Sequence, residues 1–572
     1  MDRALISLKF TMLRHTARGL RLFGWIAGAI LVAGTWALVV FASPEARHSV
    51  LTLSFALWGA IAALGPVLTS GAGVLRPSYF ALLPLTRAEL GRGILLSVFV
   101  SIAASFVLLT LFASGVHALA LSPATIVVAV VGALLTWVLV IAVSRLVFGL
   151  LGAAMRSKVG IEIAGIQFGL MFAAMFTGWM IVQVAIQTIP RLLTSGIPDP
   201  TITAVLDAFP TSWSVLGIER AASGDWGGAA LLLAALLALD VVVILATIPL
   251  LAPRVAGSSR RQRQRPRSVS LVAGGGVLPR TQLGAVIGKE LRQWNRDGWR
   301  SLEVRSAVWT GIAIGAFALA SVNYSVVAAF SGLIVAFMLG IAACTVYSQD
   351  GTAVWQTIVG QDETSVQSDV RGRQWAPVLI FFPQAVAISA IFVILSGEYW
   401  TIPIIIAALP ALFGAASGAA IIVAAVGVSP GVDPRQRVGP NDAVGNISIH
   451  VWIVMLLITV GSLPTVAAII AMLVVPAWWT TAIAMLVGIA NGFAAAWLLG
   501  RVAIGYLRNR MPDVFSRIRY GRIFRDGPSR GAIDWFEAST LKGEQQYREA
   551  LQKQREERLA RERRTEDAAG GR

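Results

Sequence analysis

The chain has 572 residues, of which 56% are hydrophobic and only 13% charged, and its formal net charge is +17. Soluble domains carry about 25% charged residues, so this composition excludes an ordinary soluble protein and predicts one embedded in a membrane. The single cysteine, Cys344, excludes a disulfide within the chain and a zinc site built from cysteines. The four histidines are scattered without metal-ligand spacing, and we expect neither a metal site nor a cofactor.

Long apolar segments follow one another along most of the chain. A hydrocarbon core about 30 Å thick is crossed by about 20 helical residues, so we expect about twelve transmembrane helices in two six-helix groups. The first group comprises the segments 23–41, 50–70, 94–114, 125–144, 161–186 and 229–251. The second comprises 306–322, 326–347, 376–395, 402–428, 449–475 and 478–500. The predicted class is an all-α polytopic membrane protein, with a bend or break at Pro464.

Basic residues indicate the orientation of these helices. The N-terminal segment and every second connection after it are rich in arginine and lysine, whereas the other connections carry few charges. The positive-inside rule therefore places both termini in the cytoplasm. We attribute the basic balance to topology and to anionic lipid headgroups, and expect no nucleic acid partner. The excess of arginine over lysine favours a bacterial protein of the cell membrane, whose first apolar run is a retained helix and not a signal peptide.

The chain organises into four predicted parts. Residues 1–252 form a first six-helix half, 253–280 a basic cytoplasmic linker, 281–505 a second six-helix half, and 506–572 a charged cytoplasmic tail. Within the long connection 187–228, the segment 213–222 is expected to be either an amphipathic helix at the outer surface or a plain loop. The charge spacing in 544–567 predicts a solvated helix, with partner binding as the alternative.

The two halves carry related sequence markers. Each opens with a basic amphipathic segment, 5–14 in the first half and 286–294 in the second, of the kind that lies in the headgroup plane. Lys9 and Lys289 are 280 positions apart, and the pair Gly91-Arg92 lies 281 positions before Gly372-Arg373. Two markers in nearly the same register predict a tandem duplication.

At these residues the chain resembles the permease subunits of type-2 ABC exporters. That family has six spans per half, an amphipathic helix before the first span and a short cytoplasmic helix after the second. The short helix often reads Pro-x-Ser/Thr-Arg-x-x-Leu followed by Gly-Lys/Arg, and the first half matches it with Pro84, Thr86, Arg87, Leu90, Gly91 and Arg92. The second copy, 369–373, keeps the basic end but lacks the proline, and the stretch 350–355 before it is similar to large actinobacterial permeases. The resemblance covers roughly residues 1–505.

The resemblance implies a non-catalytic permease that exports an unidentified substrate and works with one or two copies of a separate ATPase subunit. The chain has no phosphate-binding loop, because the nearest string, 284–290, has the wrong spacing and lacks the Ser or Thr that holds magnesium. The residues implied to couple to the ATPase are Pro84, Thr86, Arg87, Glu89, Arg92, Asp369, Arg371 and Arg373. For Arg87 and Arg92, membrane anchoring under the positive-inside rule is the alternative role.

Asp240 is the candidate residue of the substrate path, because it falls in the middle of a predicted span and a carboxylate there must face protein or water. A structural hydrogen bond, or a protonated acid at a helix contact, is the alternative. Three other functions remain open. An ion-coupled secondary transporter would need several buried charges, a membrane-embedded lipid-modifying enzyme would need clustered His, Asp or Glu at a membrane edge, and a scaffold would need only the charged tail.

Overall fold

A computed structural model describes residues 18–68, 86–154, 158–251, 276–321, 324–350, 354–360, 363–428 and 448–520. This part of the chain is about 90% helical and contains no strand. It has nine helices long and apolar enough to cross a membrane, or ten if a pair bent by 87° counts as one span. The prediction of an all-α polytopic membrane protein is therefore confirmed, while the count of about twelve spans, the repeat and the position of the termini stay predictions.

The chain divides into two compact units, one made of residues 1–167 and 174–263, the other of residues 168–173 and 264–572. The helices up to residue 251 are α2 (Arg18–Phe41), α3 (Arg47–Leu68), α4 (Arg87–Phe99), α5 (Ile102–Leu111), α6 (Ser114–Leu121), η2 (Pro123–Thr125), α7 (Ile126–Ala154), α8 (Lys158–Phe176), α9 (Gly178–Ser195), α10 (Pro200–Ala208), η3 (Pro210–Ser212), α11 (Trp213–Ala222) and α12 (Trp226–Leu251).

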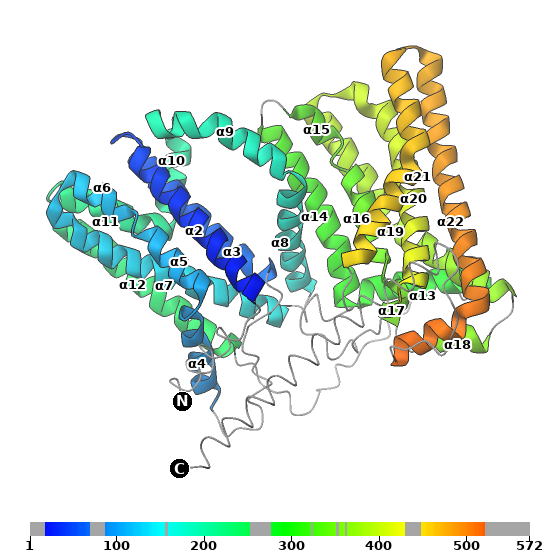
Figure 1. Ribbon diagram of the computed structural model, residues 1–572, viewed down its shortest axis with the longest axis horizontal. Coiled ribbons are helices and arrows are strands. Elements are labelled where there is room, and N and C mark those ends of the chain that lie inside the picture. The colour runs from blue at the N-terminus through cyan, green and yellow to red at the C-terminus, as the bar shows by residue number, and fades with distance from the viewer. Residues whose placement is uncertain are drawn as a thin grey trace. The chain divides into compact units, whose positions relative to one another are not determined.

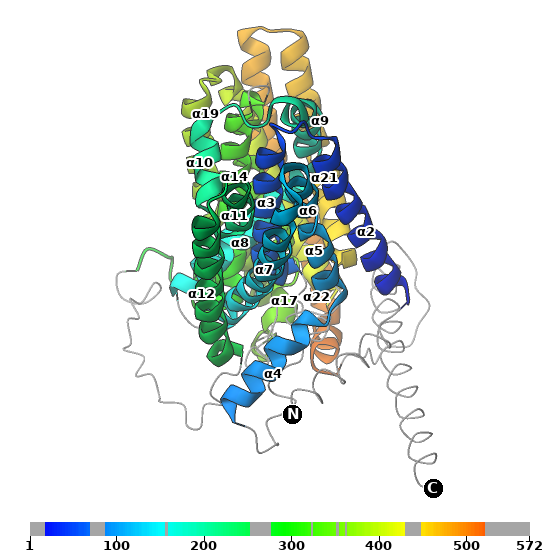
Figure 2. The same ribbon diagram turned by 90° about the vertical axis from the view of Figure 1, so that its left-hand side faces the viewer.

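In this first unit α7 is the central helix, packed against α3, α5, α11 and α12. Helix α11 lies alongside α12 (Figure 2). The predicted helix at 213–222 thus exists with the expected bounds, but its apolar face is covered by α7 and α12 and not by lipid: Val215 and Ile218 are fully buried. Helix α12 instead leaves large apolar side chains uncovered, among them Leu231, Val242 and Leu245, as expected of a helix that faces acyl chains.

The second unit contains α13 (Gln282–Arg296), α14 (Gly298–Ala320), α15 (Ser325–Ala329), α16 (Leu333–Ala343), α17 (Val346–Asp350), α18 (Trp355–Val359), α19 (Glu363–Ser396), η5 (Tyr399–Thr401), α20 (Ile402–Val426), α21 (Ser448–Val474) and α22 (Trp478–Tyr520) (Figure 1). Helix α20 is buried along most of its length between α16, α19, α21 and α22. Its glycines allow this packing, because a Cβ on Gly414 would lie 1.9 Å from the carbonyl oxygen of Gly492 in α22.

Several predicted spans differ from the observed helices. The segment 326–347 is divided among α15, α16 and α17, and 161–186 is interrupted at Thr177 between α8 and α9. The segment 94–114 is interrupted at Val100, where Ser101 starts the new helix α5 by accepting a hydrogen bond from the amide of Ala104. A capping residue of this kind ends one helix and starts another. It does not change the apolar composition of the segment, which is the feature that predicts a span.

Two other segments are more continuous than expected. Helix α21 runs through Pro464 without a break, and α22 extends 20 residues beyond the predicted end, to Tyr520. The stretch 368–374, predicted as a connection between spans, forms part of the first turns of α19. The candidate residues Asp369, Arg371 and Arg373 are therefore held on a helix that continues directly into an apolar span.

Candidate functional site

Helix α13 is the amphipathic helix predicted at the start of the second half. Thr281 caps its N-terminus, with its hydroxyl accepting a hydrogen bond from the amide of Gly284. Ile287, Glu290 and Trp294 recur at helical spacing and are buried, and this face packs against α19. A carboxylate in the middle of an otherwise apolar buried face needs partners, and Glu290 has them on two other helices, Arg300 of α14 and Arg373 of α19.

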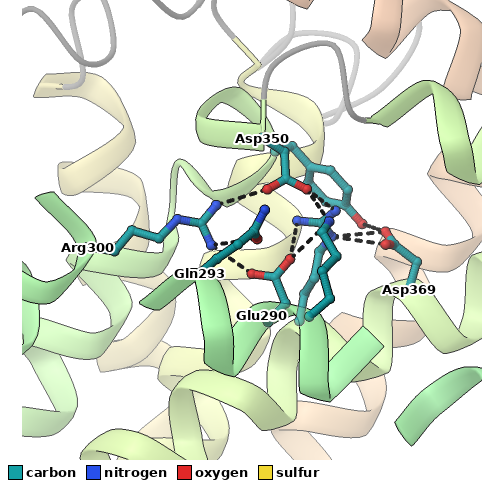
Figure 3. Close-up of polar contacts among 8 residues, drawn as sticks. Glu290, Gln293, Arg300, Asp350 and Asp369 are labelled. Carbon is teal, nitrogen blue, oxygen red and sulfur yellow. Dashed lines mark hydrogen bonds and ion pairs between the residues drawn. The ribbon is translucent and has the colours of Figure 1, made fainter. Parts of the chain in front are cut away.

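Arg373 of α19 is the centre of a buried network of charged side chains. Figure 3 labels its members Glu290, Arg300, Asp350 and Asp369. Its guanidinium nitrogens lie 2.9 Å from Glu290 Oε1, 2.6 Å from Asp350 Oδ2 and 3.1 Å from Asp369 Oδ2. The guanidinium also lies over the ring of Tyr347, 4.5 Å from its centroid, and the Tyr347 hydroxyl donates to Asp369. One arginine of α19 is thereby tied to α13 and α17.

Arg300, near the start of α14, makes a second bridge between the same carboxylates. It donates to Glu290 Oε2 at 2.7 Å and to Asp350 Oδ1 at 3.0 Å. Lys289 Nζ donates to Asp350 Oδ2, and its side chain is 35% exposed, whereas those of Glu290, Asp350 and Arg373 are completely buried. The network therefore joins α13, α14, α17 and α19, with Lys289 as its solvent-facing member.

The charges of this network balance: Lys289, Arg300 and Arg373 are positive, and Glu290, Asp350 and Asp369 are negative. Burial alone would raise the pKa of Asp350, but the charges of Arg373, Lys289 and Arg300 outweigh it and hold the pKa below its ordinary range. Each buried carboxylate is thus paired with cations. Such an arrangement offers no free acid or base for catalysis, but it fixes the relative positions of the four helices.

Gly372 lets α13 and α19 approach each other closely beside the network. A Cβ at this position would lie 2.5 Å from Val286 Cγ1 of α13, closer than real Cβ contacts. Gly91, aligned with Gly372 in the predicted repeat, is also a point of close approach, but its partner is the carbonyl oxygen of Ile248 in α12. Both glycines serve helix packing, each against a different helix.

The other predicted coupling residues lie in different surroundings. Arg371 donates to the carbonyl oxygens of Ala496 and Trp497 in α22, at 3.1 and 3.3 Å. In the first unit Thr86 and Glu89 form a capping box that starts α4, and the hydrogen bonds from Thr86 lower the pKa of Glu89. Arg87 and Arg92 are exposed on α4, and Pro84 lies outside the described residues.

Asp240, the predicted residue of the substrate path, is buried in α12, and neither of its carboxylate oxygens has a hydrogen-bond partner among the described residues. The structural hydrogen bond considered as an alternative role is therefore not seen.

Sequence reasoning missed Glu290, Arg300 and Asp350 as members of the site. The available signal was the presence of charged residues next to predicted spans, but their pairing depends on the packing of helices that are distant in sequence.

Elsewhere in the second unit an apolar cavity of about 440 Å³ lies between α19 and α20, lined by residues such as Phe382, Val393, Tyr399 and Ile406. Among the described residues, no group of three or more His, Cys, Asp or Glu is arranged to hold a metal ion.

Comparison with known proteins does not identify a family. No family model matches the chain, and no curated protein or solved structure matches it.

Proposed function

We propose that the chain is the membrane-spanning permease subunit of an ATP-driven exporter and that it works with a separate ATPase. The observation that carries this proposal is the buried charge network, which joins the amphipathic helix α13 to the membrane helices α14 and α19. A helix held in this way can transmit a push from outside the membrane, since it cannot move without its neighbours. The resemblance of 84–92 to the family's short cytoplasmic helix supports the same function.

The residues implied to contact the ATPase separate into two groups. Thr86, Arg87, Glu89 and Arg92 are exposed on α4 and at its N-cap, where a partner protein could bind them. The side chains of Asp369 and Arg373 are 5% and 0% exposed, so their proposed role is to transmit force inside the unit and not to touch the ATPase. The exposed side of α13, which includes Arg296, is the corresponding proposed contact in the second unit.

The proposal is tested by purifying the full-length tagged protein from its native host and measuring vanadate-sensitive ATPase activity and a co-purified P-loop subunit. Reversing the charges of Arg87 and Arg92 to glutamate should lower recovery of the ATPase at least about tenfold, because a desolvated charge contact at a protein interface is worth roughly 2–5 kcal/mol. The matched control is Arg191→Glu, an exposed arginine of α9 on the predicted outer side. Absence of an ATPase from the wild-type preparation, or equal recovery with all three proteins, would contradict the proposal.

A proton- or ion-coupled transporter is the second candidate, because the structure buries more charge than the sequence indicated. Asp240 is buried in the first unit. The second unit separately contains four nearly inaccessible charged side chains, those of Glu290, Arg300, Asp350 and Arg373. These four are paired with one another, however, and so carry no unbalanced charge for a coupling ion. Proteoliposomes that hold the chain alone discriminate the two functions: an ion-coupled transporter works under an ion gradient without any ATPase.

A further inference from the structure

Two histidines and two carboxylates of the first unit meet where α3, α6, α10 and α11 come together. His48, at the start of α3, places its Nδ1 2.8 Å from Glu219 Oε1 of α11 and its Nε2 2.9 Å from Asp207 Oδ1 of α10. His117 of α6 places its Nε2 3.1 Å from the same Glu219 oxygen. The sequence showed only scattered histidines and acids, because up to 171 positions separate these partners.

The geometry fixes the protonation state of His48. A neutral imidazole has one N–H donor, and its other ring nitrogen is an acceptor that would face a carboxylate oxygen with no hydrogen between them. Only the imidazolium form donates from both nitrogens to Glu219 and Asp207. Because both nitrogens are engaged, the ring has no free lone pair to act as a general base or as a metal ligand.

The charges around the ring favour the proton. Glu219 is ionised: burial alone would raise its pKa, but hydrogen bonds from His117 and His48 lower it to about 2. The hydrogen bond and charge of Glu219, followed by the charge of Asp207, outweigh burial and raise the pKa of His48 above 6.5. Two carboxylates thus face the His48 ring, and their charges favour its protonated form.

The other charged groups of the surrounding elements are few. Helix α3 contributes Arg47 beside His48, and α9, which packs on α3, contributes Arg191. In α11 Arg220 lies 4.0 Å from Asp225 of the following turn, so their charges offset each other. In α7 the charged residue is Arg145, which lies about 28 Å along the helix axis from Ile126, the first residue of α7, at a rise of 1.5 Å per residue. In α12 it is Asp240, in the middle of that helix. Helix α6 adds only His117, and η2 and η3 add no charge. Helix α10 adds Asp207 and its N-cap residue Asp199, and the exposed Glu45 precedes α3.

We propose that His48 is a proton-binding site whose imidazolium fastens α10 and α11 to the start of α3, and that loss of this proton at alkaline pH releases the two helices. With a raised pKa in the folded protein, the stabilisation is complete below the ordinary value of 6.5 and is lost as the pH rises through the raised value. Glu219 contributes above its ordinary pKa of 4.5 and loses its contribution as the pH falls through about 2. This inference does not depend on the proposed transport function.

The direct test is NMR of the full-length protein in lipid nanodiscs with ¹⁵N-labelled histidine, which is feasible because the chain has four histidines. The signal of His48 is assigned by its loss in His48→Gln or, if that variant fails to fold, by elimination with the single variants His15→Gln, His117→Gln and His450→Gln. We expect the His48 signal to remain that of an imidazolium at pH 6.5 and to change to the neutral form only at higher pH. A His48 that titrates at or below 6.5 would overturn the proposal.

The carboxylate partners and the helices provide a second test. Glu219→Gln should lower the proton affinity of His48 at least tenfold and so move its titration midpoint to lower pH. Glu45→Gln removes an exposed acid three residues before His48 and should leave the midpoint nearly unchanged. Hydrogen exchange of the wild type, corrected for its intrinsic pH dependence, should accelerate about tenfold in residues 200–222 as His48 deprotonates, but not in α7. Equal midpoints in the two variants, or unchanged exchange in 200–222, would also overturn the proposal.

Discussion

At the scale of single residues, the described part of the chain contains buried ionisable side chains of two kinds. Arg373 is surrounded by Glu290, Asp350 and Asp369, whereas Asp240 has no hydrogen-bond partner there. A buried charge that loses its partner is destabilising because the remaining charges stay desolvated, while an unpaired buried carboxylate is itself a cost that the fold already bears. The two kinds of site should therefore respond to mutation in opposite directions.

Arg373→Met should destabilise the second unit by about 3–5 kcal/mol, because it leaves three buried carboxylates with fewer cations and replaces the guanidinium by an apolar chain. The measurement is thermal unfolding of the purified protein in detergent. Arg371→Met is the matched control on the same helix: Arg371 bonds to carbonyl oxygens and not to buried carboxylates, so a smaller loss is expected. Equal losses in the two variants would contradict the structural role given to the network.

Asp240→Leu should leave the stability of the protein unchanged or raise it by about 1–3 kcal/mol, since it removes a buried polar group that has no partner among the described residues. Asp240→Asn keeps the polar cost and should gain nothing. If Asp240 belongs to a substrate path, both variants lose transport despite their preserved stability, and that comparison separates the two roles. A large loss of stability in Asp240→Leu would mean that the carboxyl group has a partner.

At the scale of helices, the close contact of α13 with α19 is what brings Glu290 near Arg373. This contact between the two helices depends on Gly372 of α19, which faces Val286 of α13. Helix propensity alone would favour alanine over glycine in a helix by about 1 kcal/mol. Any net loss on substitution therefore reports the contact between the helices and not the helix itself.

Gly372→Ala should destabilise the protein by about 1–3 kcal/mol, because the added methyl group overlaps Val286 and forces the two helices apart. Val286→Ala in the same chain should restore part of the loss. Gly505→Ala in α22 is the control, since a Cβ there meets nothing within 4 Å and should be neutral or stabilising. Thermal unfolding distinguishes the three variants, and a Gly372→Ala protein as stable as the control would show that α13 and α19 are not in close contact.

At the scale of the whole molecule, apolar segments in the sequence predicted the membrane class and most of the long helices, because burial in lipid depends on composition over about 20 residues. The breaks at Val100 and Thr177, and the division of 326–347, depend on individual caps and contacts. The charged sites depend on contacts between distant residues: Glu290 and Arg373 are in different helices, and His48 and Glu219 lie 171 positions apart. A single sequence can mark such residues as unusual but cannot pair them.

The predicted orientation can be tested over both halves with single introduced cysteines, because the native Cys344 is only 1% exposed and should react slowly. Ser223→Cys follows α11, and Ala477→Cys lies between α21 and α22; both positions belong to the predicted outer side. Ser259→Cys belongs to the predicted cytoplasmic linker. If the positive-inside rule holds, a membrane-impermeant maleimide added to intact cells labels the first two variants and not the third, and inverted vesicles give the reverse. Labelling of Ser223→Cys and Ala477→Cys from opposite sides would mean that the two halves do not share one orientation, and the tandem duplication would then have to be abandoned.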